Sequence, residues 1–148
     1  MTRAEFAAIT VRALGLTPKA NSAFSDVKNE WFAPYVGAAN AFGIVNGVGG
    51  GKFSPNGTIT RQEAATMVAR AAALCGLSNN FTEAGAKTAL SSFPDAEKAA
   101  SWAKAPLAFC FDKGVLDASM PSIEPQKPIK RCEIAQMLYN LLDRAFLL

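Results

Sequence analysis

A short pattern recurs along this chain at a nearly constant spacing, and this recurrence limits what the chain can fold into. Residues 24–26 read Phe-Ser-Asp and residues 93–95 read Phe-Pro-Asp, a separation of 69 residues. A tryptophan follows each pattern, and Trp102 lies 71 residues after Trp31. Repeats of this length are typical of stacked copies of a small unit that cannot bury its own apolar face alone. We therefore expect an array of similar units, with function in the grooves between copies.

Three segments have the composition of a helix start. Residues 2–5 and 60–63 follow Thr-Arg-x-Glu, and residues 130–133 read Lys-Arg-Cys-Glu. A threonine can cap a helix while the glutamate three residues later reaches back to the N–H group of the cap. Lys130 offers no such acceptor, so the third helix start should be weaker. Apolar residues spaced by three and four positions follow each motif, which predicts three capped helices that pack together through one face.

A second kind of helix is expected just after each tryptophan. Pro34 and Pro106 follow the tryptophans, and proline is well tolerated in the first turn of a helix. The glycines expected to end helices are Gly15, Gly43, Gly76 and Gly114. These signals predict a single all-α domain over residues 1–148, built from units of helix, loop and capped helix. Its expected parts are a partial repeat 1–20, a repeat 21–78, a connector 79–92 with a short helix, and a repeat 93–148.

Composition argues against several classes of protein. The net charge is only +3 and there is no basic cluster interleaved with aromatic residues, so nucleic acid is not an expected partner. No apolar run approaches the roughly 20 residues that a membrane-spanning helix needs, so no membrane insertion is expected. Cys75, Cys110 and Cys132 lack metal-ligand spacing, and we expect them to be small core side chains with no metal site.

The sequence contains few of the residues that enzymes use for catalysis. The sequence contains no histidine, which removes the commonest general base and metal ligand. The acidic residues recur with the repeat and do not form one unique pair, and a repeated site favours binding over catalysis. We expect no catalytic residues, no cofactor and no enzymatic activity. A glycosidase that uses a pair of carboxylates is the remaining enzymatic alternative.

The arginines of the three helix starts, Arg3, Arg61 and Arg131, are candidate ligand-binding residues. The helix dipole opposes a cation in the first helical turn, so three recurrences need another explanation. A guanidinium beside the N–H groups of a helix N-terminus would suit a carboxylate ligand. The alternative is a role without a ligand, either a structural ion pair with Asp26 or Asp95, two candidate site residues that would otherwise serve as caps, or simply a solvated side chain. The sequence leaves both interpretations open.

Glycines and tryptophans are the other candidates for ligand contact. Gly47, Gly49 and Gly50 could bring backbone amides against a sugar or its acid group, or could form an ordered turn or a flexible tip. Trp31 and Trp102 could stack on sugar rings. Their fixed place before each helix makes a core position or a wedge between copies the stronger interpretation.

Taken in order, these residues resemble the S-layer homology repeat. The resemblance rests on Phe-Ser-Asp-Val at 24–27, Trp31, Gly-Ile-Val-Asn-Gly at 43–47, Gly-Lys-Phe-Ser-Pro at 51–55 and Ile-Thr-Arg-Gln-Glu at 59–63. It is almost unbroken over residues 24–77 and looser over residues 93–142, and residues 1–16 match the end of a copy. Nearly the whole chain is covered.

This resemblance implies both a fold and a function. The family's domains look like a pseudo-threefold array of helix-loop-helix repeats around a central three-helix bundle. They attach exported proteins non-covalently to the bacterial cell wall, in the extracellular surface layer. The implied ligand is an anionic and commonly pyruvylated secondary cell-wall polysaccharide, held by the first-turn arginines and the glycine loop. The third copy lacks that loop, so at least one groove should be degenerate.

Two further expectations follow. The alternative function is a structural or assembly module that packs against neighbouring surface-layer protein, with degenerate sugar sites. The first copy also lacks its tryptophan-associated helix, so we expect an exposed apolar strip along residues 2–14. A second chain, through self-association, or the apolar tail at residues 146–148 would cover that strip.

Overall fold

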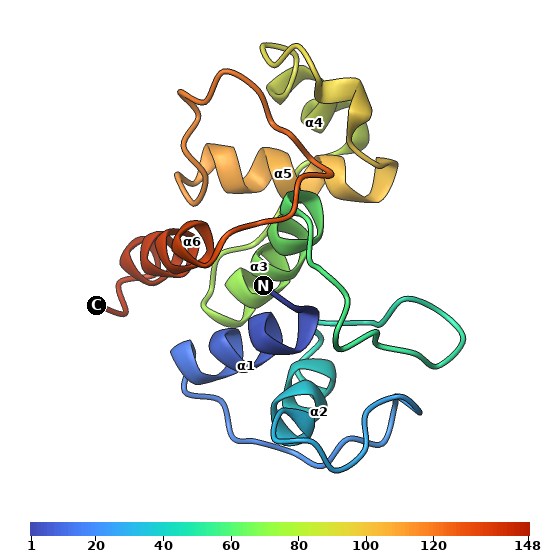
Figure 1. The fold of residues 1–148 in the computed structure, drawn as a ribbon. Coiled ribbons are helices and arrows are strands. Elements are labelled where there is room, and N and C mark those ends of the chain that lie inside the picture. The colour runs from blue at the N-terminus through green and yellow to red at the C-terminus, as the bar shows by residue number, and fades with distance from the viewer. The chain divides into compact units, whose positions relative to one another are not determined.

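The computed structural model describes residues 1–148 and consists of helices joined by loops (Figure 1). The helices are α1 (Arg3–Ala13), α2 (Ala33–Ala41), α3 (Arg61–Leu74), α4 (Glu83–Ala89), the 3₁₀ helix η1 (Ala96–Lys98), α5 (Ser101–Asp112) and α6 (Arg131–Arg144). The predicted all-α fold class is confirmed, and α4 is the short helix expected in the connector. None of the helices has the length and apolar character needed to cross a membrane.

The chain divides into two compact units, Met1–Ile59 and Thr60–Leu148. In the first unit α2 packs against α1, and in the second α5 packs against α3 and α4 while α6 packs against α3. A capped helix is therefore covered by the first helix of the next sequence repeat. The packing units are out of register with the repeats defined by sequence, because each capped helix needs a neighbour to bury its apolar face. The repeat boundaries themselves stay a prediction.

The three capped helices begin where the motifs predict. The Thr2 hydroxyl accepts the Glu5 N–H at 3.1 Å. At Thr60 the capping box is complete, because the hydroxyl accepts the Glu63 N–H and the Glu63 carboxylate accepts the Thr60 N–H. Lys130 has no side-chain acceptor, and only the second of these bonds forms there, at 3.4 Å to the Glu133 carboxylate. The third helix start is accordingly the less complete one.

The apolar stripe of the capped helices is buried in the second unit. Its buried members are Met67, Val68, Ala71 and Ala72 on α3 and Met137, Leu138 and Leu141 on α6. The central bundle of all three capped helices stays a prediction, because α1 belongs to the first unit while α3 and α6 belong to the second.

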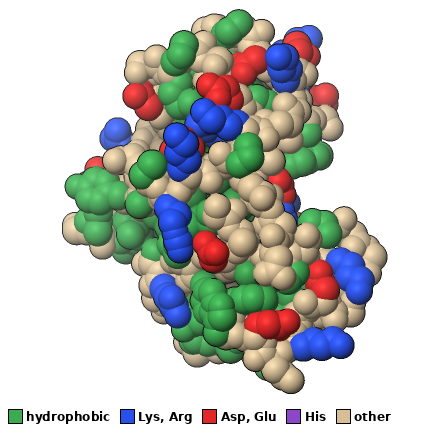
Figure 2. Space-filling view, viewed as in Figure 1, with side chains coloured by type: hydrophobic (Ala, Val, Ile, Leu, Met, Phe, Trp, Pro, Cys, Tyr) green, Lys and Arg blue, Asp and Glu red, His purple; other side chains and the backbone are tan.

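The expected exposed strip along α1 is wrong. Phe6, Ala7 and Val11 are fully buried, because α2 covers α1. Several of the large exposed apolar side chains lie on α6 and just after it, where Tyr139 is 57% and Phe146 is 93% exposed. Figure 2 shows apolar side chains gathered over α6. Self-association stays a prediction, and the exposed apolar residues on and after α6 are available for it.

Two other expectations need correction. Pro34 lies in the first turn of α2 as predicted, but Pro106 lies inside α5, which already begins at Ser101. The start of α5 is fixed early because the Ala100 N–H donates to the side-chain oxygen of Gln62 on α3, at 2.9 Å. A contact with another helix has thus overridden the local preference of proline.

The cysteines do not share one environment. Cys110 is buried as expected, and burial raises the pKa of its thiol. Cys75 is half-buried, and Cys132 is exposed at the start of α6, so the expected core position is wrong for Cys132.

Just after α6, the chain adopts a positive-φ conformation, and the corresponding positions after α1 and α3 are occupied by glycine. Gly15 and Gly76 have φ values of 65° and 85° just after their helices, and both predicted helix ends are confirmed. The corresponding residue after α6 is Phe146, whose φ is 58°. A side chain with a Cβ is strained in this left-handed region.

We expect Phe146→Gly to raise the stability of the chain. Relief of the left-handed strain should contribute about 1 kcal/mol, and the exposed ring contributes little burial to lose. In thermal unfolding this corresponds to a rise of about 3 °C in Tm. Phe146→Ala is the matched control, because it removes the exposed ring and keeps the Cβ. An equal gain in both variants would show that the ring, and not the backbone conformation, is responsible.

Candidate functional site

Each unit contains one loop that closes over the N-terminus of a capped helix. We call residues 53–57 and 123–127 the docking loops; they occupy equivalent positions 70 residues apart. Each contains one non-glycine residue with positive φ, Ser54 at 59° and Glu124 at 52°. Such a conformation persists only where surrounding contacts enforce it. The two loops are therefore held from outside.

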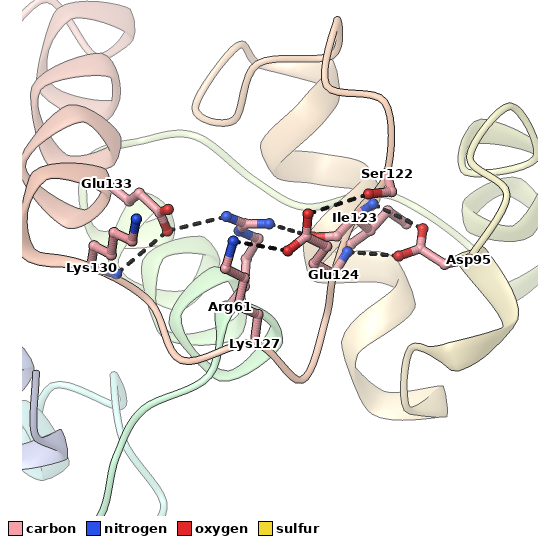
Figure 3. Close-up of polar contacts among 8 residues, drawn as sticks. All are labelled: Arg61, Asp95, Ser122, Ile123, Glu124, Lys127, Lys130 and Glu133. Carbon is pink, nitrogen blue, oxygen red and sulfur yellow. Dashed lines mark hydrogen bonds and ion pairs between the residues drawn. The ribbon is translucent and has the colours of Figure 1, made fainter.

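The aspartates of the repeated Phe-x-Asp pattern hold these loops. Asp26 accepts N–H hydrogen bonds from Phe53 and Ser54, both 2.8 Å long. Asp95 makes the same two bonds, also at 2.8 Å, with the equivalent residues of the second docking loop (Figure 3). Both carboxylates thus serve as caps of a turn. They are not the partners of the first-turn arginines.

Arg61 contacts the second docking loop with its side chain (Figure 3). Its Nη1 donates to the backbone oxygen of Ile123 at 2.7 Å, and its Nη2 pairs with the Glu133 carboxylate at 3.2 Å. The residue is only 6% exposed. A structural ion pair, one of the two interpretations of the sequence, is therefore present. Its acidic partner is Glu133 and not Asp26 or Asp95.

The backbone of α3 contacts the same loop. The Arg61 N–H donates to Lys127 O at 3.0 Å, and the Gln62 N–H donates to Pro125 O at 2.9 Å. These are amides that a helix N-terminus leaves without intrahelical partners. We expected them to be open to a ligand, and for α3 this expectation is wrong because the loop carbonyls occupy them.

The first unit repeats this arrangement. The Arg3 N–H donates to Gly57 O at 2.9 Å and the Ala4 N–H to Pro55 O at 3.0 Å. The Arg3 Nε donates to Phe53 O at 3.0 Å, and the guanidinium carbon lies 5.4 Å from the centre of the Phe53 ring. Arg3 is also 6% exposed. The first-turn arginines of α1 and α3 therefore fasten the docking loops.

Sequence reasoning identified the arginines but missed their partners. Arg61 and Ile123 are 62 residues apart, and no local pattern connects a side chain to a backbone carbonyl at that distance along the chain. The repeat could have indicated these partners, because the docking loop that contacts each arginine belongs to the following copy. Arg131 is exposed on α6, and its role in ligand binding stays a prediction.

The glycine-rich segment forms an ordered turn. The Val48 N–H donates to Lys52 O at 2.8 Å, and Gly47, Gly49 and Gly50 all have positive φ. A Cβ on Gly47 would lie 2.6 Å from Lys52 O and from the ring of Phe24, so this glycine is needed for packing. Gly49 and Gly50 are exposed with open space beside them, and their contact with a ligand stays a prediction.

Both tryptophans are exposed, Trp31 to 58% and Trp102 to 55%. The preferred interpretation, a core side chain or a wedge, is therefore wrong. Trp102 belongs to the wall of a groove of about 400 Å³ formed by α3, α5 and the residues just after α3. Exposed rings remain available for stacking on a sugar.

The acidic and cysteine residues do not form a metal centre. No group of three or more His, Cys, Asp or Glu side chains is arranged to hold a metal ion.

Burial and the hydrogen bonds from the docking loops together set the pKa values of Asp26 and Asp95. Burial raises the pKa of Asp26, but hydrogen bonds from the Phe53 and Ser54 amides and the charge of Lys52 lower it more, so the pKa lies below its ordinary value of 3.8. Asp95 is lowered in the same way by the second docking loop.

These lowered pKa values predict acid sensitivity. A carboxylate whose pKa is lower in the folded state contributes stability above its unfolded pKa and loses it as pH falls through the folded value. Stability should therefore fall below about pH 3.8 as Asp26 and Asp95 become protonated. Asp95→Asn should lose about 1–3 kcal/mol at pH 7, because an amide oxygen cannot accept both loop N–H groups equally. In urea unfolding, the free energy of unfolding of this variant should also change less between pH 7 and pH 3 than that of the parent.

Asp143→Asn, an exposed substitution on α6, is the control for the change in charge. An Asp95→Asn variant as stable as this control at pH 7 would contradict the capping role.

Arg61→Ala should also destabilise the fold. It removes the hydrogen bond to Ile123 O and leaves the partly buried Glu133 carboxylate without its cation, at a cost of about 2–4 kcal/mol. Arg131→Ala, at the equivalent exposed position of α6, should stay within about 0.5 kcal/mol of the parent. Denaturant unfolding of the two variants measures the difference. Equal stability would mean that the docking loop does not depend on the guanidinium.

Comparison with known proteins agrees with this repeated arrangement. The family model for the S-layer homology domain matches residues 23–65. This span includes Asp26, the glycine turn, the first docking loop and the start of α3. The chain is 34% identical over 148 residues to Exoglucanase XynX of Acetivibrio thermocellus, covering 98% of this chain and 13% of that protein. It is 33% identical to the Surface-layer 125 kDa protein of Lysinibacillus sphaericus, covering 97% of this chain and 12% of that protein.

A solved structure supports the fold. The undecaheme cytochrome from the S-layer of Carboxydothermus ferrireducens superposes with a TM-score of 0.58 at 20% identity, covering 98% of this chain and 17% of that one. At this identity the similarity concerns the fold alone. The curated relatives are much longer than this chain, which spans only 12–13% of the length of the two named above.

Proposed function

Because this chain carries an S-layer homology domain, we propose that it is a non-catalytic anchoring module that binds an anionic, pyruvylated secondary cell-wall polysaccharide. Its location is extracellular, at the cell wall or surface layer. The observation that carries the proposal is the family match over residues 23–65, which contains Asp26, the glycine turn, the first docking loop and the start of α3.

The arrangement of the molecule supports binding over catalysis. The same contacts among an aspartate, a docking loop and a first-turn arginine occur once in each unit. Repetition suits a polymer, whose repeating sugars can occupy several equivalent sites on one protein. Some relatives have enzyme names, but this chain spans only 13% of Exoglucanase XynX, so an activity of that protein does not pass to this segment.

The residues proposed for direct contact are those at the surface. Trp31 and Trp102 offer exposed rings, and Gly49 and Gly50 offer backbone amides at an open turn. Arg131 offers an exposed guanidinium. Arg3 and Arg61 enter the proposal as positioning residues, because their side chains are buried against the docking loops.

The chain should bind isolated cell walls that carry a secondary polysaccharide with pyruvate ketals. Removal of that polysaccharide with hydrofluoric acid, which leaves peptidoglycan, should weaken binding at least tenfold, or about 1.4 kcal/mol. Mild acid that removes only the ketal should have a similar effect if the carboxylate is recognised. Sedimentation of the walls with bound protein provides the isotherms.

The other outcomes are informative. Unchanged binding to stripped walls would exclude the polysaccharide as ligand. Self-assembly without any wall binding would favour the alternative module, which packs against neighbouring surface-layer protein, with the exposed apolar residues on and after α6 available for that contact.

A further inference from the structure

The chain contains two Asn-Gly pairs, Asn46-Gly47 and Asn56-Gly57, and both lie in the loop that joins α2 to α3 (Figure 1). Asparagine is a chemically labile residue, and before a glycine it can lose its side-chain amide without an enzyme. The backbone nitrogen of the glycine attacks the asparagine Cγ, and glycine permits this approach because it has no Cβ. Both asparagines are exposed to water. The dipeptide alone therefore predicts similar reactivity for the two pairs.

Hydrogen bonds hold the second pair in an unreactive arrangement. The Gly57 N–H donates to Ser54 O at 3.0 Å and closes the turn of the first docking loop. The Gly57 oxygen accepts the Arg3 N–H at 2.9 Å, so this glycine is held through both its N–H and its C=O group. For the reaction, the Gly57 nitrogen has to lose its proton and turn toward the Asn56 Cγ. Both steps require the docking loop to open.

The first pair lacks this protection. The Gly47 N–H donates no hydrogen bond within the chain, and the Asn46 side chain makes none either. Close packing does not distinguish the pairs, because a Cβ would lie 2.6 Å from a neighbouring atom at Gly47 and 2.7 Å at Gly57. Residues 48–52, which follow Gly47, are all exposed, and the glycines among them add backbone freedom. The hydrogen bond of the glycine N–H is thus the difference between the two pairs.

We propose that Asn46 is a site of spontaneous deamidation in the folded chain, while the docking loop protects Asn56. The Gly47 nitrogen gives its proton to hydroxide and forms a bond to the Asn46 Cγ. The bond from Cγ to the side-chain nitrogen breaks, and this nitrogen takes a proton from water and leaves as ammonia. Water then opens the resulting succinimide ring. Cleavage at Cγ gives aspartate, and cleavage at the backbone carbonyl carbon gives isoaspartate, in which the main chain runs through Cβ.

Isoaspartate at position 46 should disturb the glycine turn. It adds one carbon atom to the main chain between Val45, which is buried, and Gly47, which packs against the Phe24 ring. Neither neighbour has room to move, so the added length has to be taken up on the exposed side of the turn. The hydrogen bond from the Val48 N–H to Lys52 O lies there and should weaken.

Either product places a negative charge at the start of the glycine turn, where the chain had a neutral amide. The exposed amides of Gly49 and Gly50 in this turn are proposed contacts of an anionic polysaccharide. Like charges that meet at an interface oppose association. Deamidation of Asn46 should therefore reduce binding to the wall as the protein ages. This consequence rests on the proposed function, whereas the reaction itself does not.

Trypsin separates the two pairs, because cleavage after Lys28, Lys52 and Arg61 places Asn46 in peptide 29–52 and Asn56 in peptide 53–61. The folded chain is incubated at mildly alkaline pH, and mass spectrometry of the peptides follows the exchange of an amide for a carboxylate. Fragmentation of peptide 29–52 assigns the change to one asparagine. Deamidation of Asn46 should be at least tenfold faster than that of Asn56. In the chain unfolded by urea the two rates should agree within about threefold, because the protecting turn is lost.

Two matched variants test the effect on binding. Asn46→Gln keeps a neutral amide but would have to close a larger and less favourable ring, so it should not react over the same incubation. The incubated parent should bind polysaccharide-bearing walls at least threefold more weakly than the fresh parent, and Asn46→Gln should bind equally before and after incubation. Asn56→Gln is the control, because it changes the protected pair and should lose affinity on incubation as the parent does.

The failures of the site and of the function are distinguishable. Equal rates at Asn46 and Asn56 in the folded chain would overturn the modification site, whatever the walls show. If the fresh parent does not bind polysaccharide-bearing walls, the proposed function fails, and the two rates still decide whether Asn46 is the site. Unchanged binding by a parent whose Asn46 has been converted would overturn the effect of deamidation on binding.

Discussion

The docking of a loop onto the N-terminus of a capped helix is the contact on which each unit depends. A helix begins with amides that have no intrahelical partner, and here the carbonyls of residues 55 and 57, or of 125 and 127, accept two of them. The first-turn arginine donates to a third carbonyl of the same loop, and an aspartate from the start of the repeat holds the loop from the other side. The loop and the helix thus complete each other's hydrogen bonds, and neither would be satisfied alone.

This use of the arginines changes where a ligand can be recognised. A guanidinium buried against backbone carbonyls cannot also form both hydrogen bonds to a carboxylate in solvent. The N-terminal half of α1 and α3 therefore serves the fold. The exposed cations and rings lie toward the other half, where Arg12 contacts two aromatic rings and Arg70 shares a groove with Trp102. The two ends of one helix thus differ in chemistry because they have different neighbours.

Several features could be predicted from sequence because their causes are local. A threonine and a glutamate three residues apart begin a helix, and a glycine able to adopt positive φ ends one, as at Thr60 and Gly76. Contacts between distant segments could not be predicted. Pro106 was expected in a first turn, but Gln62 fixes the start of α5 five residues earlier. The tryptophans were expected to be covered, yet the helix that covers each capped helix leaves both rings in solvent.

The sequence by itself determined the helices, their caps and the repeat, since each of these depends on residues within a few positions of one another. It also predicted the resemblance to the S-layer homology repeat, and the model of that family matches residues 23–65. Only the tertiary structure decided what each repeated residue does. Asp26 and Asp95 became turn caps, Arg61 became a partner of Ile123 and Glu133, and α2 buried the face of α1 that sequence left open. The reason is physical: hydrogen bonds and burial that join segments far apart in the sequence, 27 residues for Asp26 and 62 residues for Arg61, leave no local trace in the chain.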